Sequence, residues 1–186
     1  MKHLSINKTI LALFVLSLFA FSSCKDDDVI TPEDPNEEEL ITSVELTFTC
    51  VFDSSIVKTF KFADPDGDGG EAPTQTDTIS LNANTNYYLA VRFLDESTLN
   101  VEDITEEVQE EADEHMVCYT TDAGTSLTIT DKDNNGLDLG LAALVATSEA
   151  ATGTFSISLK HQPDVKDGSC NVGETDVEVD FVLKVE

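Results

Sequence analysis

Oxygen-bearing side chains stand at alternate positions in two short turns, a spacing typical of calcium-binding loops. The residues are Asp64, Asp66, Asp68 and Glu71 in the first turn, and Asp131, Asp133 and Asn135 in the second. Alternate positions direct these oxygens toward one centre, the glycine that follows permits a sharp bend, and calcium takes about six to eight oxygen ligands. Calcium is therefore the cation that we expect at these turns.

Both turns also have an interpretation without a metal. Gln75 and Ala142 stand at the twelfth position, where calcium loops flanked by helices have a bidentate glutamate. The first turn is then an acidic, glycine-rich loop. In the second, Asn135-Gly136 lies between two apolar runs and is typical of a β-hairpin turn in its own right.

Cys24 follows a segment that has the composition of a secretory signal. A basic stretch over residues 1–8 precedes an apolar run over residues 10–21, which is too short to cross a bilayer as a helix. The segment resembles the lipobox of bacterial lipoproteins, with Phe21 in place of the usual leucine and small residues just before the cysteine. We expect residues 1–23 to be a signal peptide and Cys24 to carry a lipid, the alternative being an ordinary secretory signal.

Residues 24–40 form an acidic tether with no apolar period, so they are predicted to be disordered. Its first residues, Lys25-Asp26-Asp27-Asp28, resemble the acidic export signal of some lipoproteins of the Bacteroidota type. We therefore expect an outer-membrane lipoprotein that faces the cell surface. A periplasm-facing lipoprotein is the alternative.

Three cysteines follow the tether, and an oxidising envelope compartment favours one disulfide between two of them. Cys50 falls on the apolar face of a predicted strand, where a buried thiol is stable. The expected disulfide therefore joins Cys118 to Cys170. Because His115 and His161 each lie near one of these two cysteines, a zinc site of two histidines and two cysteines is the alternative.

Alternating apolar and polar residues indicate that residues 41–186 are a single domain built from strands. Apolar residues recur at every second position over 44–52, 60–62, 79–81, 87–93, 127–129, 137–141, 155–159 and 177–185. Short strands with one apolar face and a turn about every ten residues predict an all-β fold, an antiparallel immunoglobulin-like β-sandwich of about eight strands. Asp103 with Glu106 resembles a capping box, which predicts one short acidic helix from Ile104 to about Glu114.

The predicted helix is acidic along its whole length, with no Lys or Arg. Its acidic residues are Glu106, Glu107, Glu110, Glu111, Asp113 and Glu114. Like charges four positions apart repel by about 0.2–0.5 kcal/mol per pair, which a bound cation near Glu111 and His115 would relieve. The alternative is a solvated helix face.

Composition excludes several functions. The formal net charge of −27 repels phosphate backbones, so we expect no nucleic-acid partner and attachment to the membrane only through the lipid on Cys24. No G-x-S-x-G, H-E-x-x-H, P-loop or G-x-G-x-x-G pattern occurs, so no enzyme is predicted. With no Trp and three Tyr, the aromatic platform of a glycan-binding cleft is also thin. The sequence predicts a binding or structural module, with a cation- or small-ligand-binding lipoprotein as the alternative.

Several strings together resemble those of an uncharacterised group of bacterial lipoproteins. The strings are Asp64-Pro-Asp-Gly-Asp-Gly-Gly, Asp103-Ile-Thr-Glu-Glu, Glu111-Ala-Asp-Glu-His115, Asp133-Asn-Asn-Gly136 and Gly173-Glu-Thr-Asp-Val177. This group is often labelled "type 1 periplasmic binding fold superfamily protein". The label implies two α/β lobes, whereas the strands of this chain do not alternate with helices. The resemblance carries over no catalytic residue.

Overall fold

The computed structural model describes residues 40–67 and 69–186. The predicted signal peptide, Cys24 and most of the tether lie outside the described residues. Within the described part of the chain, no helix is long and apolar enough to cross a membrane.

Two β-sheets form a sandwich, which confirms the predicted all-β fold class. The larger sheet contains β1 (Ser43–Cys50), β2 (Val57–Ala63), β3 (Gln75–Thr76), β5 (Asn86–Asp95), β6 (Glu102–Asp103), β8 (Thr125–Ile129) and β9 (Ala142–Thr147). Its strand order is β3-β2-β1-β5-β9-β8, and β6 pairs with β5. The described residues therefore contain no α/β lobe of the kind that the family label implies.

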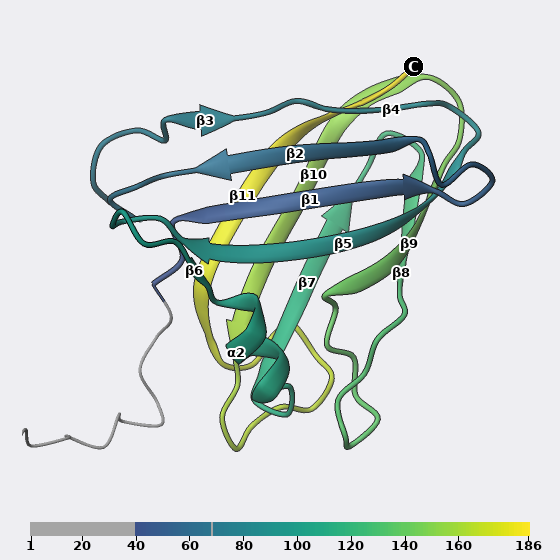
Figure 1. Cartoon of the computed structure of the whole chain (residues 1–186). Coiled ribbons are helices and arrows are strands. Elements are labelled where there is room, and N and C mark those ends of the chain that lie inside the picture. The colour runs from purple at the N-terminus through teal and green to yellow at the C-terminus, as the bar shows by residue number, and fades with distance from the viewer. Residues whose placement is uncertain (1–39, 68) are drawn as a thin grey trace, which may run out of the picture. The chain divides into compact units, whose positions relative to one another are not determined.

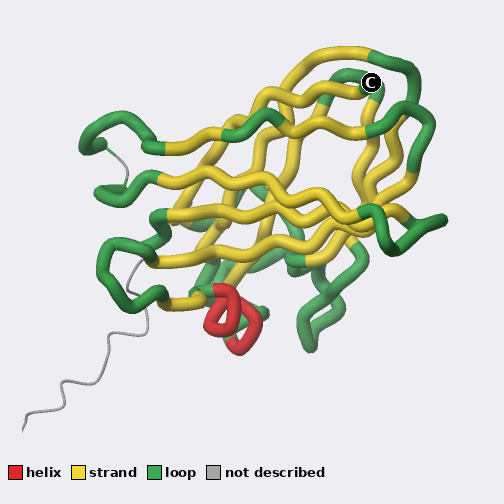
Figure 2. Tube along the Cα trace, turned by 45° about the horizontal axis from the view of Figure 1, so that its top comes forward, coloured by secondary structure: helices red, strands yellow, loops and turns green. Residues whose placement is uncertain are grey.

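The smaller sheet lies behind the larger one in Figure 1, and its strands cross those of the larger sheet at a steep angle. It contains β4 (Ile79–Leu81), β7 (His115–Thr121), β10 (Ala151–His161) and β11 (Glu174–Val185) in the order β4-β11-β10-β7. The prediction of purely antiparallel strands was wrong at one place, because β4 pairs with β11 in parallel. The chain leaves β3 at the edge of the larger sheet and, after Asp77 and Thr78, enters β4 at the edge of the smaller sheet. This segment therefore connects the two sheets along one side of the sandwich (Figure 1; the strands are yellow in Figure 2).

The core lies between the inner faces of the two sheets, where the apolar residue of each alternating pair is buried. Phe48 stands at its centre and contacts the rings of Tyr87, Phe60 and Phe155 edge to face, with ring centroids 6.2, 5.9 and 6.1 Å away. Phe48, Tyr87 and Phe155 are fully buried, and each such side chain stabilises the fold by about 1.5–3 kcal/mol relative to exposure.

The helix is shorter than predicted. α2 spans Thr105–Glu110 and has Ile104 at its N-cap, with no side-chain capping bond. The Asp103 carboxylate instead accepts a hydrogen bond from the backbone N–H of Thr105 at 3.2 Å and pairs with Arg92 at 2.8 Å. The predicted capping box was therefore wrong, because the Asp103 carboxylate forms an ion pair with Arg92 of β5 and does not cap the helix.

One strand is displaced relative to the prediction. The alternation over residues 137–141 predicted a strand, but β9 begins only at Ala142 and its pairing with β8 at Ala143. The Lys132–Asp138 bridge, closed by an ion pair of 2.5 Å, holds the preceding residues in a hairpin loop. Gly136 has a φ of 84°, which L residues rarely adopt, so the predicted turn at Asn135-Gly136 is present.

Candidate functional site

A groove runs between the loop that follows β2 and the first half of β11. It consists of two adjoining hollows of about 440 and 450 Å³, which share Phe62, Asp64 and Glu178. On one side both hollows are lined by the loop residues between Asp64 and Pro73, and on the other by consecutive residues of β11 from Thr175 to Asp180. Hollows of this size are typical of small-ligand and peptide sites.

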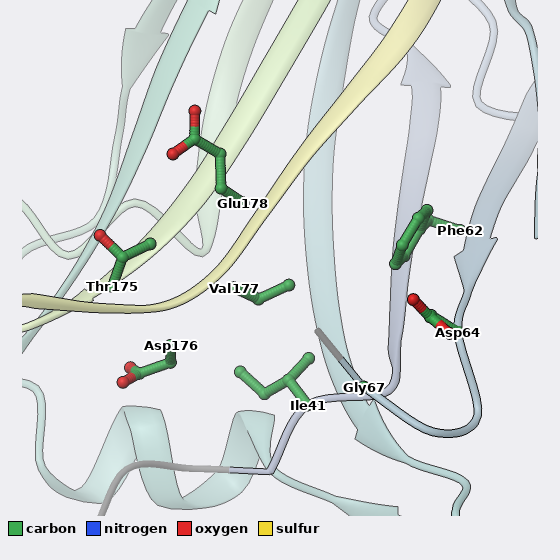
Figure 3. Close-up of a pocket in the computed structure, with 8 residues that line it drawn as sticks. All are labelled: Ile41, Phe62, Asp64, Gly67, Thr175, Asp176, Val177 and Glu178. Carbon is green, nitrogen blue, oxygen red and sulfur yellow. The ribbon is translucent and has the colours of Figure 1, made fainter. Parts of the chain in front are cut away.

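The floor of the groove is apolar and its walls are acidic. Ile41, Phe62 and Val177 form the floor of the first hollow, and Figure 3 shows Ile41 and Val177 between Asp64 and Asp176. The carboxylates that line the two hollows come from both sides of the groove: Asp64 and Glu71 from the loop, and Asp176, Glu178 and Asp180 from β11. Glu178 points away from Val177 in Figure 3, as neighbouring residues of a strand must. The electrostatic potential along the groove is therefore strongly negative, which favours a cationic ligand.

The first predicted calcium turn forms the loop wall of this groove. Asp64 is 8 % exposed, and its backbone N–H donates to the carbonyl of Thr42 at 2.8 Å while its own carbonyl accepts from Gly67 at 3.1 Å. The Asp66 carboxylate accepts the backbone N–H of Glu71 at 2.7 Å. This hydrogen bond, with a smaller contribution from the Asp64 side chain, lowers the pKa of Asp66. Asp68, the third predicted ligand, lies outside the described residues.

The outer carboxylates of the groove form no ion pair among the described residues, and the ammonium group of Lys160 beside the groove wall donates to Thr175 instead. Glu71, Glu178 and Asp180 are exposed, and none of them belongs to an ion pair of the described residues. By contrast, carboxylates on the outer face of the larger sheet are paired: Glu96 with Lys61 at 2.7 Å and Glu45 with Arg92 at 3.2 Å. The negative field thus persists at the groove but is partly cancelled on the larger sheet.

The second predicted calcium turn is occupied by an ammonium group of the protein itself. The Asp133 carboxylate accepts the backbone N–H groups of Asn135 at 2.8 Å and Leu137 at 2.9 Å through Oδ1, and lies 2.9 Å from Lys166 Nζ through Oδ2. Burial would raise the pKa of Asp133, but the hydrogen bonds from Lys166 and the turn lower it overall. Asp131 is directed elsewhere, since its Oδ1 accepts the backbone N–H of Gly140 at 3.0 Å.

Lys166 also joins three separate loops at this end of the sandwich. Its side chain is only 3 % exposed, and its Nζ donates to the carbonyl of Ala112 at 2.6 Å as well as to Asp133. Lys166 lies in the loop between β10 and β11, Asp133 in the loop between β8 and β9, and Ala112 in the loop after α2. A single buried ammonium therefore stabilises the whole end, which is a structural role.

The cysteines and histidines near this end do not form the alternative zinc site. Cys118 and Cys170 are joined by a disulfide with Cα atoms 6.0 Å apart, the pairing that the sequence favours, and this bond consumes both thiols. Cys50 is buried and is the one free cysteine of the described residues. His115 stacks on His161 with ring centroids 4.8 Å apart and an interplanar angle of 8°.

His115 is a fully buried histidine that is held in its neutral form. Its Nδ1 lies 3.2 Å from the carbonyl of Glu111, and its Nε2 has no hydrogen-bond partner among the described residues. Burial lowers the pKa of His115 to about 4, and the nearby charges of His161 and Lys166 contribute a smaller decrease. The imidazole is thus uncharged at neutral pH.

The carboxylates of α2 do line a shallow hollow of about 340 Å³. It is formed by Glu102, Asp103, Glu106, Glu107, Glu110 and Glu111. Over residues 40–67 and 69–186, however, no three His, Cys, Asp or Glu side chains converge closely enough to hold a metal ion. The larger groove beside β11, which combines an apolar floor with acidic walls, is therefore the stronger candidate site.

Comparison with known proteins adds no further assignment. No family model and no curated protein matches the sequence, and no solved structure matches the fold. The groove itself is therefore the feature from which a function can be inferred.

The sequence predicted one wall of the groove and missed the other. The spacing of Asp64 and Glu71 makes them candidates, whereas the alternation gives Glu178 and Asp180 only as polar residues of the last strand and does not single out Asp176. The alternation of acidic and apolar residues in that strand was visible. Nothing local in the sequence indicates that this strand lies opposite the loop after β2, about a hundred residues earlier in the chain.

Proposed function

We propose that this chain is a lipid-anchored envelope protein whose β-sandwich is a non-catalytic binding module for a cationic ligand. The groove between the loop after β2 and β11 carries the proposal. It joins an apolar floor to carboxylates on both walls, three of which make no ion pair among the described residues. A cation with an apolar portion would bury that portion on Phe62 and Val177 and place its charge beside Glu178 and Asp180.

The proposed cellular location depends on the segment before the described residues. A lipid on Cys24, followed by an acidic tether, would hold the sandwich at the outer membrane and leave the groove accessible to envelope or extracellular ligands. The disulfide between Cys118 and Cys170 is consistent with an oxidising compartment. Labelling with a radioactive fatty acid tests the anchor, because Cys24→Ser should abolish the label.

The binding proposal is tested with the full chain and two cationic probes, spermine and a lysine-containing peptide. We expect calorimetry at low salt to detect binding of at least one probe. The double variant Glu178→Gln, Asp180→Asn should weaken that binding by about threefold to tenfold, as expected for two exposed charge contacts. The matched control is Glu106→Gln, Glu110→Gln, which removes the same charge from α2 and should leave affinity within about twofold.

Two results would contradict the proposed site. If neither probe binds, the groove is not a cation site. If both double variants weaken binding equally, the interaction reflects only the net charge of −27 and not the groove.

Calcium is a second candidate ligand for the loop wall of the same groove. One observation bears on it: the Asp64 side chain, which is largely buried, contributes to lowering the pKa of Asp66. Asp64, Asp66 and Glu71 do not by themselves converge on one metal position, so such a site also requires Asp68, which lies outside the described residues. A divalent cation at this turn would relieve the repulsion between the Asp64 and Asp66 carboxylates, and Glu71 lies on the same loop. The second turn is a weaker candidate because Lys166 already neutralises Asp133.

A further inference from the structure

We propose that the groove binds its ligand by strand addition, with a basic, extended segment of a partner protein pairing along the open edge of β11. This inference rests on the proposed function and names the class of ligand. It follows from three features of the groove: an exposed backbone edge, the position of that edge along a hollow, and the charge around it.

The outer edge of β11 is covered by a strand only at its C-terminal end. β11 extends from Glu174 to Val185, but β4 pairs with Leu183–Val185 alone. On its other side β11 pairs with β10 along almost its whole length. Within the described residues, therefore, no strand covers the outer edge of residues 174–182.

The backbone groups on this open edge belong to Glu178 and Asp180. Glu186 donates its N–H to the carbonyl of Leu81 at 2.9 Å, and its carbonyl accepts from Ala83 at 2.9 Å, so the backbone groups of Glu186 point toward β4. In a strand, every second residue directs its N–H and C=O to the same edge, so those of Asp180 and Glu178 point the same way. No hydrogen bond to either residue's edge groups occurs among the described residues.

The groove follows this edge and not a face of the sheet. A strand turns successive side chains to opposite faces, so a hollow on one face is lined by every second residue. Here the two hollows are lined by six consecutive residues, Thr175 to Asp180. The space therefore lies beside the backbone edge of β11, where an added strand would run.

The charge around the edge selects the occupant. An added strand pairing with six residues would be about 20 Å long and would present every second side chain to the exposed Glu178 and Asp180. Lys or Arg at those positions would be complementary, while the intervening side chains would contact Phe62 and Val177 on the apolar floor. A second copy of this chain, with a net charge of −27, would be repelled from the same edge.

An open edge of this kind is usually protected against unwanted pairing by charge. Glu178 and Asp180 serve that purpose against acidic or neutral chains, but they attract a basic one. The same two side chains therefore exclude self-association and favour a basic extended peptide, which gains affinity from backbone hydrogen bonds and specificity from charge.

The test uses the full chain in EDTA and the probe peptide Ac-(Lys-Val)4-NH2. Two further peptides carry N-methyl groups, either on all the lysines or on all the valines, so that each blocks the N–H groups of one edge only. We expect one methylated peptide to bind at least about tenfold more weakly than the probe and the other to bind within about threefold. Bound probe should also slow amide hydrogen exchange at Glu178 and Asp180.

A change on the protein side complements the peptides. Asp180→Pro removes the N–H that points to the open edge and leaves the hydrogen bonds between β11 and β10 intact, as proline is tolerated at strand edges. Its control is Asp180→Asn, which removes the charge but keeps that N–H. The proline variant should bind the probe at least about fivefold more weakly than the asparagine variant. Circular dichroism tests whether both variants are folded. If the proline variant is unfolded, the result with the methylated peptides decides.

The outcomes separate this inference from the proposed function. If both methylated peptides bind as tightly as the probe, strand addition is refuted and a cation-binding groove remains. The same holds if spermine displaces the probe fully and binds as tightly per charge, although it protects no backbone amide of β11 from exchange. If no cationic probe responds to Glu178→Gln, Asp180→Asn, both proposals are refuted.

Discussion

Acidification should destabilise this protein through one buried imidazole, that of His115. Burial lowers the pKa of His115 to about 4 from the ordinary value of 6.5. Because the folded-state pKa lies below the unfolded-state pKa, the unfolded chain binds a proton first as the pH falls. The contribution of His115 to stability is therefore fully present above pH 6.5 and is lost as the pH decreases toward 4.

The magnitude follows from the difference between these two values. One pKa unit corresponds to about 1.4 kcal/mol, so protonation of His115 should remove about 3 kcal/mol of stability over this pH range. The hydrogen bond between Nδ1 and the Glu111 carbonyl offsets only part of the burial cost, and the buried Nε2 has no hydrogen-bond partner among the described residues. The neighbouring charged or titratable groups are His161, which stacks on the ring, Lys166, and Glu114, whose carboxylate is 4.0 Å from His161.

Urea unfolding at several pH values between 4 and 7.5 measures this effect. Because the chain has 37 carboxyl side chains, the absolute stability also changes with pH for other reasons, and the comparison must be with a variant. His115→Phe keeps an aromatic ring against His161 but cannot be protonated. The stability of wild type relative to the variant should fall by about 3 kcal/mol between pH 7 and pH 4. A stability difference between wild type and His115→Phe that stays constant over this pH range would refute the argument. Glu106→Gln, a change at an exposed side chain, serves as the control.

Other changes test the remaining parts of the structure. Lys166→Met should destabilise the fold by about 3–5 kcal/mol in urea unfolding because it leaves the Asp133 carboxylate buried and unpaired, and adding Asp133→Asn should restore part of the loss. If the double variant is no more stable than Lys166→Met, the ammonium group stabilises the fold mainly through the Ala112 carbonyl. The double change Cys118→Ser, Cys170→Ser should cost about 2–4 kcal/mol, and an unchanged melting temperature would show that the disulfide contributes little. Calcium at a hundredfold excess over its dissociation constant should stabilise the protein by about 2.7 kcal/mol if the first turn binds it. Asp66→Ala should abolish that shift and Asp131→Asn should not, so calorimetry without heat at millimolar calcium would exclude the site.

The strand pattern was predictable because burial in a two-layer sandwich repeats with the period of the strand. The alternation at residues 44–52 and 177–185 identifies β1 and β11, although β1 ends at Cys50 and β11 begins at Glu174. Most of the alternating apolar residues lie in the core, whereas Phe52 is exposed. The alternation at 137–141 failed as a guide, since Leu139 joins the hydrophobic core from a loop and not from a strand. The short edge strands β3 and β6, of two residues each, are too brief to show any period.

The two acidic turns illustrate the limit of local motifs. Their spacing is nearly identical in the sequence, yet Asp133 binds an ammonium group 33 residues further along the chain while Asp64 lines an open groove. The carboxylate spacing specifies which oxygens are close together. It does not specify which cation, if any, the rest of the fold brings to them.

The sequence by itself determined the class of the fold, the acidic character of the surface and the disulfide partners, because these depend on local periodicity, composition and the exclusion of one buried cysteine. Tertiary structure alone decided where the groove lies, since its walls come from residues 64–73 and 175–180, which meet only when the two sheets pack. It also decided that β4 stops short on β11 and leaves the backbone of Glu178 and Asp180 exposed. The physical reason is that the pairing of strands depends on the free energy of burying whole sheets. That free energy is a sum over many contacts between distant residues, which no short segment of the sequence contains.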